Sequence, residues 1–222
     1  MDASPTRSAP RWLLVTLAVI AAAAVAFAIG RFTAFGATAT PQTPGTYSAD
    51  AGFARDMQLH HAQAVDMAME IYRKTDDADV RMLAYDMATT QSAQIGEMYS
   101  WLVAWNLPQR GGELMAWMAD SDGGHGGHAA STAPLSEQEL RDSMGMAADE
   151  QLAALDAATG TEADCLFLTL MIRHHEGAIE MVDAVLELGT EPRVKAVASA
   201  MAEVQQFEID AMNSSLLRLG CS

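Results

Sequence analysis

The chain has 222 residues, half of them hydrophobic, with 13 Lys and Arg against 29 Asp and Glu. This length provides for one sizeable core with an attached segment rather than for several domains. Only Arg7, Arg11, Arg31 and Asp2 are charged before residue 45, which leaves 10 basic and 28 acidic residues, a formal charge of −18, for the rest. So acidic a surface repels nucleic acid and anionic lipid headgroups, which excludes nucleic-acid binding. It attracts cations, but without forming a specific site for them.

An apolar run opens the chain. Residues 12–30 are apolar or small except Thr16. At a rise of about 1.5 Å per residue, this run is long enough to cross the hydrocarbon core of a bilayer. Arg7 and Arg11 precede it and only Arg31 follows closely, so residues 1–11 are predicted to lie in the cytoplasm and the domain outside it. The run predicts a single-pass membrane segment.

A cleaved signal peptide is the alternative for this run. Ala37-Thr38-Ala39 is an acceptable small-residue cleavage site, which would give a secreted protein. The run exceeds the length of about 7–15 residues that is typical of a signal's apolar region, which favours retention. Both interpretations export the domain. Residues 31–48, rich in Thr, Ala, Pro and Gly, are predicted to be a linker.

Helical periodicity dominates the remaining chain. Proline is absent from 45–107 and 135–191, where apolar residues recur at three- and four-residue steps. A capping box of Ser136 and Glu139 starts a short helix, and Pro192 fits the first turn of the last one. The predicted helices cover 49–73, 77–105, 136–157, 162–188 and 191–218.

Two segments of the chain are copies of each other. The pair His60-His61 recurs as His174-His175, an offset of 114 residues (174 minus 60). The same offset maps Phe53 onto Phe167, Met57 onto Met171, Val65 onto Ile179, Met67 onto Met181, Met87 onto Met201, Gln91 onto Gln205, Ile95 onto Ile209 and Met98 onto Met212. Each repeat, about 49–105 and 162–218, is predicted to be a helical hairpin. Joined by the connection 106–161, the hairpins predict an all-α four-helix bundle over 49–218.

The hairpins also predict which polar side chains lie level with one another. Counted in residues from the turn between the two helices, His60 and Gln91 lie at nearly the same height along the first hairpin. In the second hairpin, His174 and His175 stand level with Gln205, and Met171 with Glu208. Buried polar groups need partners, so these side chains are expected to form a layer across the bundle.

The recurring unit Met-x-x-His-His indicates the chemistry. Thioether and imidazole ligands suit monovalent copper better than hard cations. No Glu lies three positions before a histidine, which disfavours a di-iron carboxylate site. A zinc-protease motif beginning at His175-Glu176 fails because position 179 is Ile179.

Packing is the alternative for many of these residues. Methionine is a common core filler, and packing is the expected role of Met67, Met82, Met87, Met98, Met181, Met201 and Met212. Histidine often serves as a buried hydrogen-bonding group, but the duplication of the pair favours a functional site. Within the connection, Met115, Met118, His125, His128, Met144 and Met146 could gather or release a metal, with a flexible spacer as the alternative.

Cys165 and Cys221 are candidates for a disulfide, because they would lie at the same end of the second hairpin in an exported domain. Two buried thiols and a thiolate metal site are the alternatives. The absence of any C-x-x-C motif argues against the last.

The segments Phe53-Ala-Arg-Asp-Met57-Gln-Leu-His60-His61 and Phe167-Leu-Thr-Leu-Met171-Ile-Arg-His174-His175 resemble the bacterial family called domain of unknown function 305. The resemblance covers about 49–218 and implies a ferritin-like four-helix fold, export or membrane anchoring, and an association with copper binding and tolerance. It implies metal ligands at Met57, His60, His61, Met171, His174 and His175, supported by Gln91, Gln205 and Glu208. The sequence departs from the family at Ala163, and Gln94 stands where the second repeat has Glu208.

The prediction is an extracytoplasmic, membrane-tethered protein that binds copper(I) for sequestration, tolerance or handover, without turnover. Two alternatives stay open: a ferritin-like oxidoreductase with a redox-active metal, and an interaction module that uses its acidic surface. Homo-oligomerisation also stays open. An enzyme would need an open coordination position and a substrate pocket.

Overall fold

The computed structural model describes residues 43–119 and 135–221. The predicted membrane or signal run, residues 12–30, and the connection histidines His125 and His128 lie outside the described residues. Residues Pro44–Ser222 form one compact unit, which contains every helix described below. In the described part of the chain, no helix is long and apolar enough to cross a membrane.

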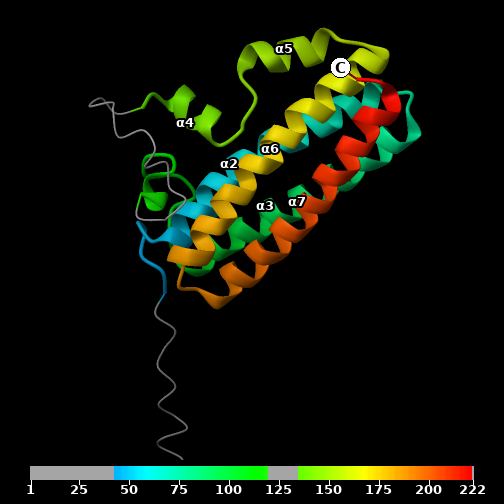
Figure 1. The fold of residues 1–222 in the computed structure, drawn as a ribbon. Coiled ribbons are helices and arrows are strands. Elements are labelled where there is room, and N and C mark those ends of the chain that lie inside the picture. The colour runs from blue at the N-terminus through cyan, green and yellow to red at the C-terminus, as the bar shows by residue number, and fades with distance from the viewer. Residues whose placement is uncertain (1–42, 120–134, 222) are drawn as a thin grey trace, which may run out of the picture. The chain divides into compact units, whose positions relative to one another are not determined.

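Four long helices form two hairpins, as Figure 1 shows. The first joins α2 (Ala49–Lys74) to α3 (Ala78–Ala104), and the second joins α6 (Gly160–Leu188) to α7 (Pro192–Leu219). Contacts between α2 and α6 hold the hairpins together. The described residues contain no strand, and the predicted all-α class is confirmed.

Local sequence signals set the ends of these helices. The Ser48 hydroxyl accepts the Ala51 N–H at the start of α2, and an Asp77 carboxylate oxygen accepts the Asp79 and Val80 N–H groups at the start of α3. Pro192 occupies the first turn of α7, where no intrahelical donor is lost. The helix α7 ends at Gly220 in the left-handed conformation.

An aspartate at the start of each hairpin contacts the turn of the other hairpin. The carboxylate of Asp50 in α2 accepts the Thr190 N–H and hydroxyl and the Glu191 N–H at the turn of the second hairpin. At the equivalent position of the second repeat, Asp164 hydrogen-bonds the Thr75 side chain at the turn of the first hairpin. This exchange fixes the two hairpins about an approximate two-fold axis.

The connection differs from its prediction. Instead of one helix over 136–157, the chain forms α4 (Glu137–Ser143) and α5 (Asp149–Ala157), with the expected capping box at Ser136. Gly145 breaks the helix with a φ of 74°. The break lets the main chain approach α6: a Cβ at Gly177 would lie 1.9 Å from the Met144 carbonyl oxygen.

A short strap precedes the undescribed part of the connection. It contains the 3₁₀ turn η1 (Ala116–Met118), and the Asp56 carboxylate of α2 accepts both the Met115 N–H and the Trp117 ring N–H. Trp117 packs so closely on α2 that a Cβ at Gly52 would lie 2.3 Å from it. The strap thereby buries Met115 and Met118.

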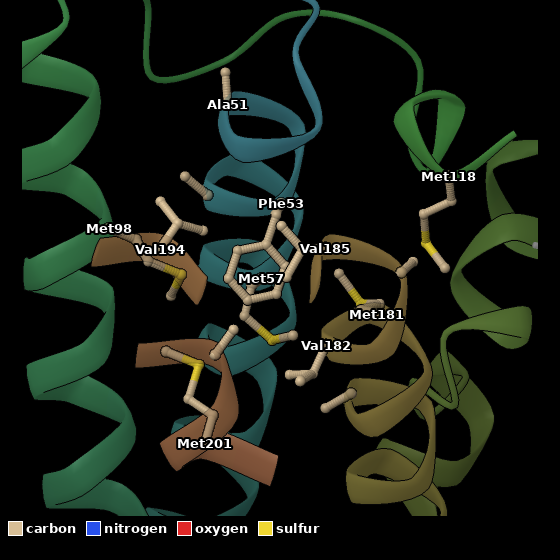
Figure 2. Packing of buried hydrophobic residues seen from close by; sticks show 14 of the residues in the cluster. Ala51, Phe53, Met57, Met98, Met118, Met181, Val182, Val185, Val194 and Met201 are labelled. Atoms are coloured by element: carbon tan, nitrogen blue, oxygen red, sulfur yellow. The ribbon is translucent and has the colours of Figure 1, made fainter. Parts of the chain in front are cut away.

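Two buried apolar clusters fill the bundle, one of them drawn in Figure 2. Cys165 and Cys221 form a disulfide with Cα atoms 5.6 Å apart, tying the start of α6 to the end of α7. Arg218 of α7 pairs with Asp77 of α3 at 2.7 and 2.8 Å. These links join the helix ends on one side of the bundle.

Candidate metal centre

Both histidine pairs lie in the interior of the bundle. His60 and His61 come from the middle of α2, and His174 and His175 from the middle of α6. None of the four is more than 1% exposed. Neutral imidazole has one donor and one acceptor, so each ring needs partners or carries an unsatisfied polar atom.

The first histidine of each pair faces the other hairpin. The rings of His60 and His174 lie against each other with centroids 3.7 Å apart and planes inclined by 35°. Since the two residues are equivalent in the repeat, this contact lies at the approximate two-fold axis. It is the point at which the two halves of the candidate centre meet.

The second histidine of each pair faces the partner helix of its own hairpin. His61 Nε2 lies 2.8 Å from the Gln94 side-chain oxygen of α3, and His175 Nε2 lies 2.7 Å from a Glu208 carboxylate oxygen of α7. Each contact spans 33 residues, so the repeat preserves the geometry while the acceptor changes from amide to carboxylate.

This pairing corrects the predicted levels. Gln91 and Gln205 were expected beside the histidines, and both are buried in the polar region at 3% exposure. Their side-chain oxygens have no hydrogen-bond partner among the described residues. The histidine partner in the first repeat is Gln94, one turn further along α3. The repeat could have identified it, because Gln94 is the counterpart of Glu208.

The connection supplies a partner that sequence reasoning missed. His60 Nε2 lies 3.0 Å from the main-chain carbonyl oxygen of Met144, at the break between α4 and α5. A carbonyl oxygen can only accept, so Nε2 of the neutral ring carries the proton. No side-chain pattern encodes a main-chain acceptor, but Gly145 and Gly177 permit its approach.

The opposite ring nitrogens are left without partners. Oxygen atoms lie at hydrogen-bond distance from Nε2 of His60, His61 and His175, so the remaining ring nitrogen of each is Nδ1, which presents a lone pair in the neutral rings of His60 and His61. No hydrogen bond reaches these Nδ1 atoms, nor Nε2 of His174. Buried lone pairs without donors are costly to a fold and are the form in which imidazole binds a metal. These nitrogens are therefore of the chemical kind that binds a metal ion.

Burial keeps the rings of His60, His61 and His174 neutral. Desolvation lowers the pKa of His60 and of His61 to about 3, with neighbouring histidines adding to the effect. Desolvation, followed by electrostatic repulsion from the neighbouring histidines, lowers the pKa of His174 well below its usual range. At neutral pH a metal ion would not compete with protons for these three rings.

The thioethers of the repeat unit are divided between the two clusters. Met57 is fully buried in the cluster drawn in Figure 2, and Met171 is fully buried in the other one. Met115, Met118, Met144 and Met146 of the connection join the cluster of Met57. Across residues 43–119 and 135–221, no three His, Cys, Asp or Glu side chains are grouped closely enough to hold a metal ion by themselves.

Comparison with known proteins identifies the family of this chain. The sequence profile of a family described as domain of unknown function (DUF305) matches residues 50–216. The chain belongs to the DUF305 family. Among curated proteins, no sequence matches it.

Solved DUF305 structures share the fold. A Streptomyces coelicolor protein described as secreted has 37% identity and a TM-score of 0.68, over 79% of this chain and 96% of its own. A Deinococcus radiodurans fragment has 30% identity and a TM-score of 0.62, over 77% and 96%. CopM in its Cu(I)-bound form has 22% identity and a TM-score of 0.55, over 76% and 96%. CopM structures bound to Cu(II) and to silver have the same fold.

Proposed function

We propose that this protein binds monovalent copper outside the cytoplasm and holds it for sequestration or handover. The observation that carries the proposal is the set of four buried imidazoles, each with a ring nitrogen that has no hydrogen-bond partner. A fold that needed the histidines only for hydrogen bonding would satisfy both nitrogens. A metal ion satisfies the lone pairs that the protein leaves open.

Copper(I) suits these side chains better than zinc or iron. Neutral imidazole and thioether are borderline and soft ligands, and copper(I) prefers such donors. The residues that would hold it are His60, His61, His174 and His175, with Met57 and Met171 one turn away. Gln94, Glu208 and the Met144 carbonyl would orient the rings, as outer partners of metal-bound histidines do. Membership of DUF305 and the copper- and silver-bound CopM structures support this choice.

Burial favours storage over turnover. The four rings are no more than 1% exposed, so an ion among them would be shielded from substrates as well as from water. An enzyme needs an open coordination position next to a substrate pocket. We therefore propose a binding protein rather than an oxidoreductase, with the ferritin-like architecture that the family resemblance implies.

Location outside the cytoplasm rests on three further observations. Residues 12–30 have the composition of a membrane or signal segment, and the Streptomyces relative is described as secreted. The disulfide Cys165–Cys221 suits an oxidising compartment. Cell fractionation with mass spectrometry tests the tether: recovery with membranes and peptides from before Ala39 support retention, whereas a soluble product starting at Thr40 supports cleavage.

Competition titration tests the metal assignment. The purified protein is titrated with copper(I) against a chelator of known affinity, and in parallel with zinc. The proposal expects tighter retention of copper(I). Equal or tighter retention of zinc would remove the copper assignment.

A further inference from the structure

The buried methionines of the four long helices form two equivalent sets. The helices contain eight methionines that are at most 2% exposed. The repeat offset pairs all eight: Met57 with Met171, Met67 with Met181, Met87 with Met201, and Met98 with Met212. Met69 and Met82, the two remaining methionines of these helices, are not buried and have Asp183 and Ala196 as their counterparts.

The clusters divide these eight residues evenly. One cluster contains Met57, Met98, Met181 and Met201, and the other contains Met67, Met87, Met171 and Met212. Each set takes one methionine from each of the helices α2, α3, α6 and α7. Figure 2 labels the four methionines of the first set among the other buried apolar residues of their cluster.

The two sets bracket the polar layer. In α2, Met57 precedes the histidine pair and Met67 follows it, and in α6 Met171 and Met181 do the same. In α3, Met87 precedes the glutamines and Met98 follows them. In α7, Met201 precedes Gln205 and Met212 follows Glu208. The histidine layer therefore lies between two sets of four repeated methionines, and the cluster of the first set also contains Met115, Met118, Met144 and Met146 of the connection.

Packing alone does not account for this pattern. Methionine exchanges with leucine or isoleucine in cores at little cost. Other buried positions of the repeat have exchanged: Ala54 is matched by Leu168, Ala68 by Val182, Ile71 by Val185 and Trp101 by Ser215. Some buried positions are unchanged, such as Phe53 with Phe167 and Val80 with Val194, and all eight fully buried methionines are unchanged as well. Because leucine or isoleucine can replace methionine in a core at little cost, the retention of all eight favours a requirement for sulfur.

We infer that each set of four methionines is a thioether site for a soft monovalent ion, copper(I) or silver(I), on either side of the histidine layer. Four neutral thioethers in a dry, uncharged environment offer little to zinc, calcium or magnesium, which prefer thiolate, imidazole or oxygen ligands. The choice of ion rests on the proposed function, but six of the eight side chains lie outside the proposed histidine and methionine ligands.

Silver(I) titration of the full chain tests the inference. One variant carries Met98→Leu, Met181→Leu and Met201→Leu, and another carries Met67→Leu, Met87→Leu and Met212→Leu; both keep Met57 and Met171. The control carries Met69→Leu and Met82→Leu; Met82 is exposed, and Met69 is only partly buried against the second cluster. We expect each triple variant to lose one silver equivalent per chain and the control to lose none. Circular dichroism verifies that the variants are folded.

A second measurement does not depend on the variants. In selenomethionine-labelled wild-type protein loaded with silver, X-ray absorption at the silver edge should show more than one selenium neighbour per silver ion. Full silver stoichiometry in both triple variants, or at most one selenium neighbour per silver, would assign the methionines to packing alone.

The same data separate this inference from the proposed function. Replacing all four histidines by alanine should leave the two thioether-bound equivalents in place. Suppose that the quadruple histidine variant retains two bound ions, and that wild-type protein binds no copper(I) at the histidines. The proposed histidine centre then fails and the thioether sites stand. If every bound ion is lost with the histidines, the thioether sites fail and the histidine centre stands.

Discussion

The imidazole ring of His60 lies against that of His174, with centroids 3.7 Å apart. These residues occupy equivalent positions in two copies of one sequence, so the duplication brings its most reactive side chains together at the axis between its halves. A metal bound to one histidine pair would lie next to the other pair. The two halves should therefore behave as one centre.

Replacing Glu208 with glutamine tests how the outer partner acts. Its carboxylate accepts from His175 at 2.7 Å and makes the ring a stronger ligand than the amide of Gln94 makes His61. We expect Glu208→Gln to weaken copper(I) binding by about 10- to 100-fold, the usual effect of losing such a partner. Glu203→Gln, on the exposed side of the same helix, should leave the affinity unchanged. If Glu208→Gln binds copper(I) as tightly as Glu203→Gln does, Glu208 does not affect the copper(I) affinity of the histidine centre.

Gly177→Ala tests the close approach of the connection to α6. The added Cβ would lie 1.9 Å from the Met144 carbonyl oxygen, so the connection and its hydrogen bond to His60 must shift. We expect a loss of about 2 kcal/mol in the free energy of unfolding, as overpacking typically costs. Gly96→Ala meets nothing within 4 Å and should stabilise α3 by about 0.5–1 kcal/mol. Denaturant unfolding measures both, and a neutral Gly177→Ala would contradict the packing of this loop.

The sequence predicts the features of the fold that depend on the order of side chains, but not those that depend on main-chain contacts between distant segments. The offset of 114 residues predicted the hairpins and the interior position of both histidine pairs, because a helical period and a repeat are properties of side-chain order. Four long helices formed within two residues of their predicted bounds.

The break in the helix predicted over 136–157 depends on a contact with another helix. Gly145 adopts a positive φ because the Met144 carbonyl approaches Gly177 of another helix, a contact that local sequence does not encode. The pairing of His61 with Gln94, where Gln91 was expected level with His60, likewise depends on the relative rotation of α2 and α3. Counting residues from a turn gives height along a helix but not rotation about it.

Asp77→Ala should destabilise the protein in a pH-dependent way. Asp77 caps α3 and pairs with Arg218 of α7, and that pairing, with the cap, lowers its pKa to about 2. A carboxyl whose pKa is lower in the folded state contributes stability above its unfolded pKa of about 3.9, which is lost as the pH falls towards 2.

We expect Asp77→Ala to lower the free energy of unfolding by about 1–2 kcal/mol at pH 7, with the difference narrowing between about pH 4 and 2. Urea unfolding at a series of pH values measures this. Asp76→Ala, an exposed neighbour, is the control and should have little effect. A pH-independent difference would mean that the side chain acts by packing rather than by charge.

The most direct test of the histidine centre is copper(I) competition titration of three variants: His60→Ala with His61→Ala, His174→Ala with His175→Ala, and all four together. Because the rings of His60 and His174 lie in contact, either double variant should lose most of the affinity that the quadruple variant loses, so that the effects are strongly non-additive. Additive losses would mean two independent half-sites. If neither double variant changes copper(I) binding while both lower the thermal unfolding temperature, the histidines are core hydrogen-bonding residues and the proposed metal centre is wrong.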